Sequence, residues 1–191
     1  MAKRKLRIFL DIDEVLLDFR TAACQIHGNL THEEMHVRFG QLHDRTWWDG
    51  DEFYKPIHEL GARFWFEIEP LSWFDDLLYC ICRYDEEVAL ISSPPQGQGR
   101  QRWHYFAGRS ESIMSLFGNY FDRFHLTPHK HDFAYIPGAV LIDDNLNHVN
   151  NFISHGGHAV LFPSLYNSNF RYMSDPVSYV QEKLEEISQC I

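Results

Sequence analysis

Basic residues are scarce in this sequence. Its 191 residues include 17 lysines and arginines against 27 aspartates and glutamates, which gives a formal net charge of −10 at pH 7. Stable, non-specific binding to DNA or RNA needs a basic surface, so this balance argues against it. The same balance leaves room for a small phosphorylated substrate in a pocket that is positively charged only locally.

Long apolar runs are also missing. No segment approaches the roughly 20 apolar residues that cross a bilayer. The apolar segment that follows the basic N-terminus, 6–10, is too short for the core of a signal peptide. We therefore expect no membrane association and a cytoplasmic location. Cysteines are few and scattered, which favours reduced thiols over a zinc site: Cys24, Cys80, Cys82 and Cys190.

Short apolar segments alternate with amphipathic segments along most of the chain. Strands are expected at 6–10, 88–91, 139–142 and 159–162, with a weaker candidate at 124–127. Helices are expected at 18–27, 73–83, 100–106, 146–155 and 177–189. Strands that alternate with helices predict an α/β fold, in which helices cover both faces of a Rossmann-like parallel sheet.

Residues 28–70 differ in character from the rest. Thr31 and Glu34 have the spacing of a capping box, which opens a helix. Another helix is expected at 51–60, and aromatic residues are dense throughout the segment. Because the segment follows the first strand and helix, we interpret it as a small helical cap. Additional core helices without a special role are the alternative.

Two domains follow from this interpretation. Residues 1–27 and 71–191 would form the α/β core domain, and residues 28–70 the cap. The aromatic residues around Trp47 and Trp48 suit either a pocket or the interface of a homodimer.

Polar residues follow three of the expected strands at the point where each strand ends: Asp11 and Asp13, Ser92 and Ser93, and Asp143 and Asp144. The carboxyl ends of parallel strands meet at one edge of the sheet, where ligands bind. Carboxylates that are crowded together repel unless a cation or a shared proton relieves them. Mg²⁺ binds through one or two carboxylates together with substrate phosphate oxygens. The aspartates therefore predict a Mg²⁺ site, whereas either pair alone could equally cap a helix.

A phosphoryl group at this edge would need hydrogen-bond donors and a positive charge. Ser92 and Ser93 offer hydroxyl and backbone N–H groups. Lys130 precedes the third strand and is the candidate for the cation that offsets charge on the phosphoryl group. Taken alone, Lys130 would be interpreted as a solvated surface residue. With the strand ends, it favours phosphoryl-transfer chemistry.

These residues resemble the four ordered motifs of the haloacid dehalogenase (HAD) superfamily. The motifs are DIDEVL at 11–16, Ser92, Lys130, and the pair Asp143 and Asp144. Within that superfamily the chain is similar to the 5'(3')-deoxyribonucleotidases. That similarity lies in DIDEVLLDF at 11–19, FWFEIEPL at 64–71 and ISSP at 91–94. The resemblance spans nearly the whole chain and implies the HAD fold, with a cap inserted after the first strand and helix.

The resemblance implies a magnesium-dependent phosphatase that works through an aspartyl phosphate. Asp11 would attack phosphorus. Asp13 would protonate the leaving oxygen and then activate the water that hydrolyses the intermediate. The metal would be held by Asp11, by the main-chain carbonyl of Asp13, and by Asp143 or Asp144.

The resemblance also implies contacts with the substrate. Ser92 and Lys130 would bind phosphoryl oxygens, and Arg100 replaces a family lysine and would contact phosphate. Phe19 and Trp65 would line the pocket and stack on a base, because every base offers a π face. Each ring taken alone would be interpreted as core packing.

The chain departs from the family at several places, including the stretch before Lys130 and the loop at 94–99, which is shorter than its family equivalent. Glu14 stands where glycine is usual, and the cap at 28–63 matches only weakly. Three functions are therefore weighed. The first is a 5'-nucleotidase for (deoxy)nucleoside monophosphates. The second is a phosphatase for another small phosphorylated metabolite or a nucleic-acid end. The third, a non-catalytic protein that binds a phosphate ligand, is disfavoured because all four motif positions carry competent residues.

Overall fold

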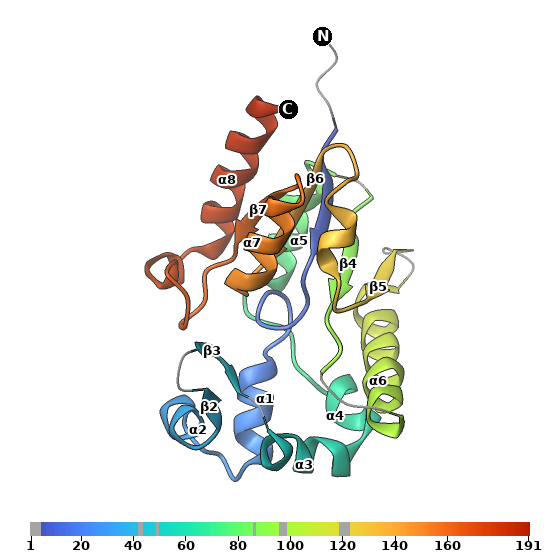
Figure 1. Ribbon diagram of the computed structural model, residues 1–191, viewed down its shortest axis with the longest axis vertical. Helices are drawn as coiled ribbons and strands as arrows, with labels where there is room; N and C mark the ends of the chain where they lie inside the picture. The colour runs from blue at the N-terminus through green and yellow to red at the C-terminus, as the bar shows by residue number, and fades with distance from the viewer. Residues whose placement is uncertain (1–4, 42–43, 49, 86, 96–98, 119–122) are drawn as a thin grey trace. The chain divides into compact units, whose positions relative to one another are not determined.

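The chain forms two compact units (Figure 1). The computed structural model describes residues 5–41, 44–48, 50–85, 87–95, 99–118 and 123–191. The first unit consists of Met1–Leu16, Leu71–Ser93 and Phe121–Ile191, and the second of Leu17–Pro70 and Pro94–Tyr120. The second unit thus contains the whole of the expected cap together with segments on both sides of it.

The first unit is built on a five-stranded parallel sheet. Its strands are β1 (Arg7–Leu10), β4 (Ala89–Ser92), β5 (Phe124–Leu126), β6 (Ala139–Asp143) and β7 (His158–Leu161). They lie in the order β5-β4-β1-β6-β7, with β1 paired to both β4 and β6. The expected α/β fold is confirmed, including the weaker strand candidate.

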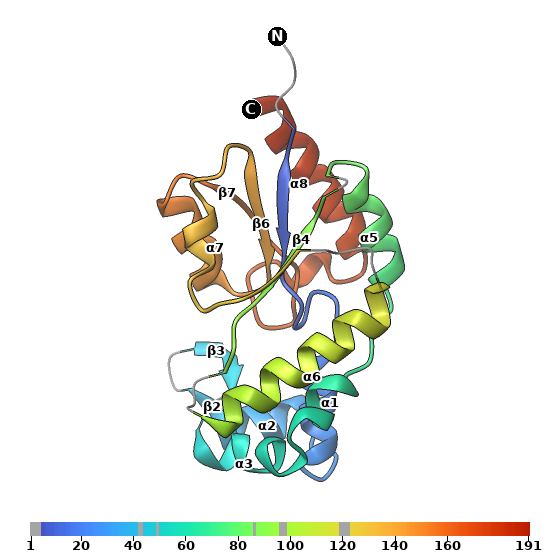
Figure 2. The ribbon, with the colours of Figure 1, turned by 90° about the vertical axis from the view of Figure 1, so that its right-hand side faces the viewer.

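Helices cover both faces of this sheet. They are α5 (Phe74–Cys82), α7 (Leu146–Ser154) and α8 (Pro176–Cys190), with the short 3₁₀ helices η2 (Lys130–Phe133) and η3 (Phe170–Tyr172). Figure 2 shows α7 on one side of the sheet and α5 with α8 on the other. Phe9, Leu141 and Phe152 belong to the core that β1, β6 and α7 share. No helix in the described part of the chain is long and apolar enough to cross a membrane.

The second unit is mainly helical. It contains α1 (Phe19–Ile26), α2 (His32–Phe39), α3 (Asp51–Leu60), α4 (Ala62–Phe66) and α6 (Arg100–Phe117). An antiparallel pair of strands, β2 (Gly40–Gln41) and β3 (Asp44–Trp48), is added to the expected helices.

Two helices begin with the expected chemistry. Thr31 and Glu34 form a complete capping box at the start of α2. At the start of α8, the side chain of Asp175 accepts a hydrogen bond from the backbone N–H of Ser178, and Pro176 occupies the first turn. Local sequence therefore sets these boundaries.

Helix α6 is longer than the sequence predicts, since the expected helix at 100–106 continues to Phe117. Gly108 lies inside it, where glycine normally weakens a helix. A Cβ atom at Gly108 would overlap the carbonyl oxygen of Ala62 and lie 2.7 Å from Cβ of Trp65. Glycine therefore allows α4 and α6 to pack closely, and this packing outweighs the low helix propensity.

Candidate active site

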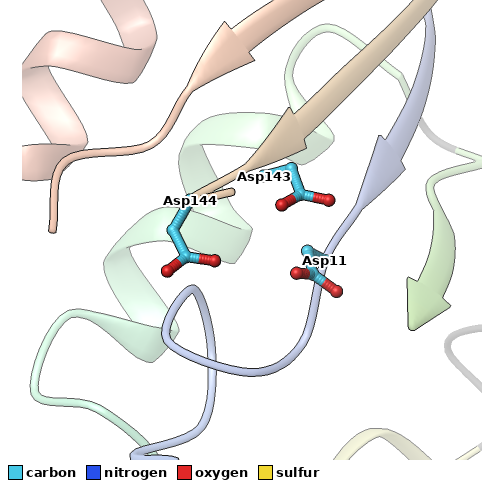
Figure 3. A group of neighbouring side chains, drawn as sticks. All are labelled: Asp11, Asp143 and Asp144. Atoms are coloured by element: carbon cyan, nitrogen blue, oxygen red, sulfur yellow. The ribbon is translucent and has the colours of Figure 1, made fainter. Parts of the chain in front are cut away.

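Three carboxylates gather at the carboxyl ends of β1 and β6 (Figure 3). Asp11 directly follows β1, Asp143 ends β6, and Asp144 comes next. The backbone N–H of Asp11 donates to the carbonyl of Ile142 at 2.9 Å, which keeps the two strand ends in register. One carboxylate oxygen from each aspartate lies within 4.8 Å of the others. Such a group of oxygen ligands could hold a metal ion.

Lys130 bridges two of these carboxylates. Its Nζ lies 2.7 Å from Asp11 Oδ1 and 2.7 Å from Asp143 Oδ2, and its side chain is only 2% exposed. Burial lowers the pKa of Lys130, but the two carboxylates outweigh burial and raise the pKa overall. The ammonium group therefore stays charged across the ordinary pH range.

The two carboxylates that Lys130 contacts have opposite pKa shifts. Burial, together with the charge of Asp143, raises the pKa of Asp11 to about 8, although Lys130 acts in the other direction. Burial also acts to raise the pKa of Asp143, but Lys130 and His148 outweigh it and lower that pKa. A neutral Asp11 cannot attack phosphorus. A further positive charge at this place would hold Asp11 ionised near neutral pH, and a divalent cation fits that need.

The sequence reasoning missed His148 as part of this site. His148 Nδ1 lies 3.0 Å from Asp143 Oδ2, the oxygen that Lys130 also contacts. The backbone N–H of Asn145 donates to the other oxygen of Asp143 at 2.8 Å. His148 lies four residues after Asp144, about one turn into α7, and that spacing is the available signal. It is hard to recognise among twelve dispersed histidines.

Asp13 and Ser92 also meet at these strand ends. The hydroxyl of the buried Ser92 donates to Asp13 Oδ2 at 3.4 Å. The hydroxyl of Ser93 donates instead to the backbone carbonyl of Thr127 at 3.3 Å. The structure thus brings Ser92 to a predicted catalytic carboxylate and directs the Ser93 side chain to the main chain after β5.

The turn after Asp13 has a backbone conformation that favours glycine. Glu14 has a φ of +61°, a left-handed conformation that glycine adopts without steric penalty. A hydrogen bond from the N–H of Leu16 to the carbonyl of Ile12, at 2.8 Å, closes this turn. For a residue with a Cβ atom the conformation costs roughly 1–2 kcal/mol. This chain keeps the turn without the glycine.

The other predicted residues belong to the second unit. The rings of Phe19 and Trp65 are stacked, with centroids 5.7 Å apart and planes 11° apart. Trp65 is only 3% exposed and also meets the ring of Tyr105 edge-on at 4.7 Å. Trp65 is therefore a core residue of this unit. Arg100 is the first residue of α6 and is exposed.

No family model matches the chain, and the comparison with curated proteins finds no relative. Solved structures do match. A dehalogenase in an intermediate complex has a TM-score of 0.54 at 10% identity, over 96% of this chain and 98% of the dehalogenase. A protein assigned as a beta-phosphoglucomutase from Thermotoga maritima has a TM-score of 0.52 at 18% identity, over 95% of this chain and 99% of its own. The haloacid dehalogenase fold that the sequence predicts is confirmed.

Proposed function

We propose that this chain is a magnesium-dependent phosphomonoesterase that works through an aspartyl phosphate at Asp11. The observation that carries the proposal is the setting of this one carboxylate. It lies at a strand end, in contact with the buried cation of Lys130, and within 4.8 Å of ligand atoms from Asp143 and Asp144. A carboxylate nucleophile flanked by fixed positive charge suits attack on a phosphate ester.

The residues present fit Mg²⁺. It is a hard cation that prefers oxygen ligands, and the carboxylates of Asp11, Asp143 and Asp144 supply them. The main-chain carbonyl of Asp13 would add a further oxygen. When bound, the ion would supply positive charge that keeps Asp11 ionised and offsets charge on the phosphoryl oxygens.

The protein groups have distinct roles in the proposed reaction. Lys130 holds Oδ1 of Asp11, so Oδ2 would form the bond to phosphorus while the bond from phosphorus to the leaving oxygen breaks. Asp13 would give its proton to that oxygen, then take a proton from the water that cleaves the aspartyl phosphate. This second step releases phosphate and restores Asp11. Ser92 and Lys130 would bind the phosphoryl oxygens, with Arg100 as a further phosphate contact.

We propose a (deoxy)nucleoside monophosphate as the substrate. Two features support this choice: the similarity of the segment at 64–71 to the deoxyribonucleotidases, and the stacked rings of Phe19 and Trp65. Because Trp65 is nearly fully buried and Phe19 only half-buried, Phe19 is the ring that would meet the base. Trp65 would support it from behind. Aromatic stacking accepts any base, so this pair selects a class of substrate rather than one nucleotide.

One assay tests both the proposed chemistry and the proposed substrate. It measures phosphate release from a panel of nucleoside 5'- and 3'-monophosphates and sugar phosphates, with Mg²⁺ and with EDTA. Turnover that requires Mg²⁺ and favours a nucleotide is the expected result. Turnover that requires Mg²⁺ but favours a sugar phosphate would keep the chemistry and reject the nucleotide. Turnover that survives in EDTA would contradict the magnesium assignment, and no turnover of any ester would favour a binding protein on the same fold.

A further inference from the structure

An asparagine side chain organises the segment that joins β7 to α8. The Nδ2 of Asn167 donates to the carbonyl of Asp144 at 2.9 Å and to the carbonyl of Phe162 at 2.7 Å. Its Oδ1 accepts from the backbone N–H groups of Asn169 at 2.9 Å and Ser164 at 3.4 Å. Both donor hydrogens and the acceptor of the amide are therefore in use.

These bonds join the ends of two neighbouring strands. Asp144 follows β6 and Phe162 follows β7. The backbone N–H of Phe162 donates to the carbonyl of Asp143 at 2.9 Å, which is the last rung between the two strands. The side chain of Asn167 links the same two strands just beyond this hydrogen bond, through the carbonyls of Asp144 and Phe162. Holding the carbonyl of Asp144 fixes the peptide plane after it and hence the position from which its side chain leaves the backbone.

Apolar burial anchors the start of this segment at Phe162, whereas polar bonds hold its middle. Asn167 is 9% exposed, whereas Leu165 is 60% exposed and Phe170 is 61% exposed. Because those two apolar side chains remain largely in solvent, they contribute little to holding the segment in place. Loss of the Asn167 amide would instead remove the donor to the buried carbonyl of Phe162 and to the part-buried carbonyl of Asp144, which is costly.

We propose that Asn167 is a positioning residue for the metal site. It holds the backbone of Asp144, whose carboxylate lies near those of Asp11 and Asp143 (Figure 3). The inference rests on the proposed function in one respect, namely that these carboxylates bind Mg²⁺. Mg²⁺ demands near-ideal octahedral geometry, so a rotated carboxylate binds it poorly. Loss of a group that orients a metal ligand typically weakens metal binding ~10–100-fold.

Asn169 provides a matched control in the same segment. Its Nδ2 donates to the carbonyl of Leu161 at 2.8 Å and to the hydroxyl of Tyr179 at 2.8 Å. These bonds also anchor the segment to β7 and α8, but they lead away from Asp144. Asn167 and Asn169 both hold the segment in place, but of the two it is Asn167 that contacts the backbone of Asp144.

The test compares Asn167→Ala, Asn167→Asp and Asn169→Ala in the full chain. Asn167→Asp keeps an acceptor for the turn, loses both donated bonds and adds a negative charge. The added charge by itself favours a cation, so weaker Mg²⁺ binding in this variant would report lost positioning of Asp144. Calorimetric titration with Mg²⁺, without substrate, measures the dissociation constant directly. We expect both Asn167 variants to bind Mg²⁺ ~10–100-fold more weakly and Asn169→Ala to bind it as the wild type does. Phosphatase activity of the Asn167 variants should recover as Mg²⁺ is raised.

Equal weakening in Asn169→Ala would overturn the proposal, because stability of the segment would then explain the effect. Unchanged Mg²⁺ binding in both Asn167 variants would overturn it too. A wild-type protein that binds Mg²⁺ but hydrolyses no phosphate ester would reject the proposed function, while the three variants would still decide the role of Asn167. A wild-type protein that binds no Mg²⁺ would overturn both.

Discussion

The two units accommodate buried charge in different ways. In the first unit, Lys130 lies between the carboxylates of Asp11 and Asp143, so buried charges of opposite sign are in contact. In the second unit, buried cations lie over aromatic rings, as Arg20 does over Trp48 at 4.6 Å. Arg109 likewise lies over the ring of Trp65 at 5.2 Å.

The ion pairs of the first unit and the cation–ring contacts of the second suit different functions. Carboxylates and an ammonium group can exchange partners with a metal ion and a phosphate, as group transfer requires. Buried rings that lie under a cation accommodate its charge within an apolar core. On the proposed function, the first unit would carry the reaction and the second the choice of substrate. Substitutions in the two units should therefore affect different measurements.

The largest effect is expected from Asp11→Asn, which keeps the shape of the side chain and removes the nucleophile. Turnover of every phosphate ester should fall by at least about 10³-fold, because no aspartyl phosphate can form. Asp132→Asn is the control, since it removes a carboxylate that is 67% exposed on the same 3₁₀ helix as Lys130. It should keep wild-type rates. Activity that survives Asp11→Asn would place the reaction elsewhere.

Removal of the buried cation should be the largest change in stability. Lys130→Met leaves Asp11 and Asp143 without their shared partner, and an uncompensated buried charge costs about 3–5 kcal/mol. Lys183→Met, which breaks a partly exposed pair with Glu186, should cost less than about 1 kcal/mol. Urea denaturation of both variants in EDTA measures the two free energies of unfolding. Equal losses of stability in the two variants would contradict the expected difference between a buried and an exposed ion pair.

The metal-free protein should also become less stable as pH rises. The pKa of Asp11 is raised to about 8 in the folded protein, chiefly by burial, whereas the unfolded chain loses that proton near pH 4. Between these values the unfolded chain holds fewer protons at this group, so its ionisation opposes folding. Asp11→Asn should remove this contribution. Thermal denaturation midpoints of the wild type and of Asp11→Asn, measured in EDTA between about pH 4 and about pH 8, test this prediction. Identical pH profiles of the two proteins would contradict it.

A smaller and more selective effect is expected in the second unit. Phe19→Leu removes the ring that stacks on Trp65, and loss of stacking on a base is worth about 1–3 kcal/mol. The kcat/KM for nucleoside monophosphates should fall accordingly, while that for a small phosphate ester without a base should not change. Phe170→Leu, in the first unit and 61% exposed, is the control. An equal loss for both substrates would mean that Phe19 supports the fold or the chemistry instead.

Much of the fold could be predicted from sequence because its signals are local. Apolar runs predict β1, β4, β6 and β7, and capping residues predict where α2 and α8 begin. The full length of α6 could not be predicted, because Gly108 is favourable there only through its fit against α4. Tertiary packing reversed a local preference at that position.

The candidate site also combines residues that local sequence places with residues that only tertiary packing places. Asp11, Asp143 and Asp144 could be placed together because parallel strands end at one edge. His148 contacts Asp143 from the first turn of α7, and this contact depends on how the helix packs after β6. Asn167 contacts the carbonyl of Asp144 from 23 residues away, through a returning segment without a sequence signal of its own. Strand ends thus place the reacting groups, whereas supporting contacts depend on the folded chain.

The smallest effect is expected at Glu14, next to the reacting groups. Its φ of +61° is a conformation in which a Cβ atom is crowded. Glu14→Gly should relieve that strain, offset in part by the greater freedom of glycine in the unfolded chain, for a net gain of at most about 1 kcal/mol. The turn itself stays the same, so kcat should not change. Denaturation in urea measures the gain, and Glu14→Ala, which keeps the Cβ atom, is the control. A gain in Glu14→Ala equal to that in Glu14→Gly would assign the effect to the lost carboxylate near the aspartates, and the turn would then carry no measurable strain.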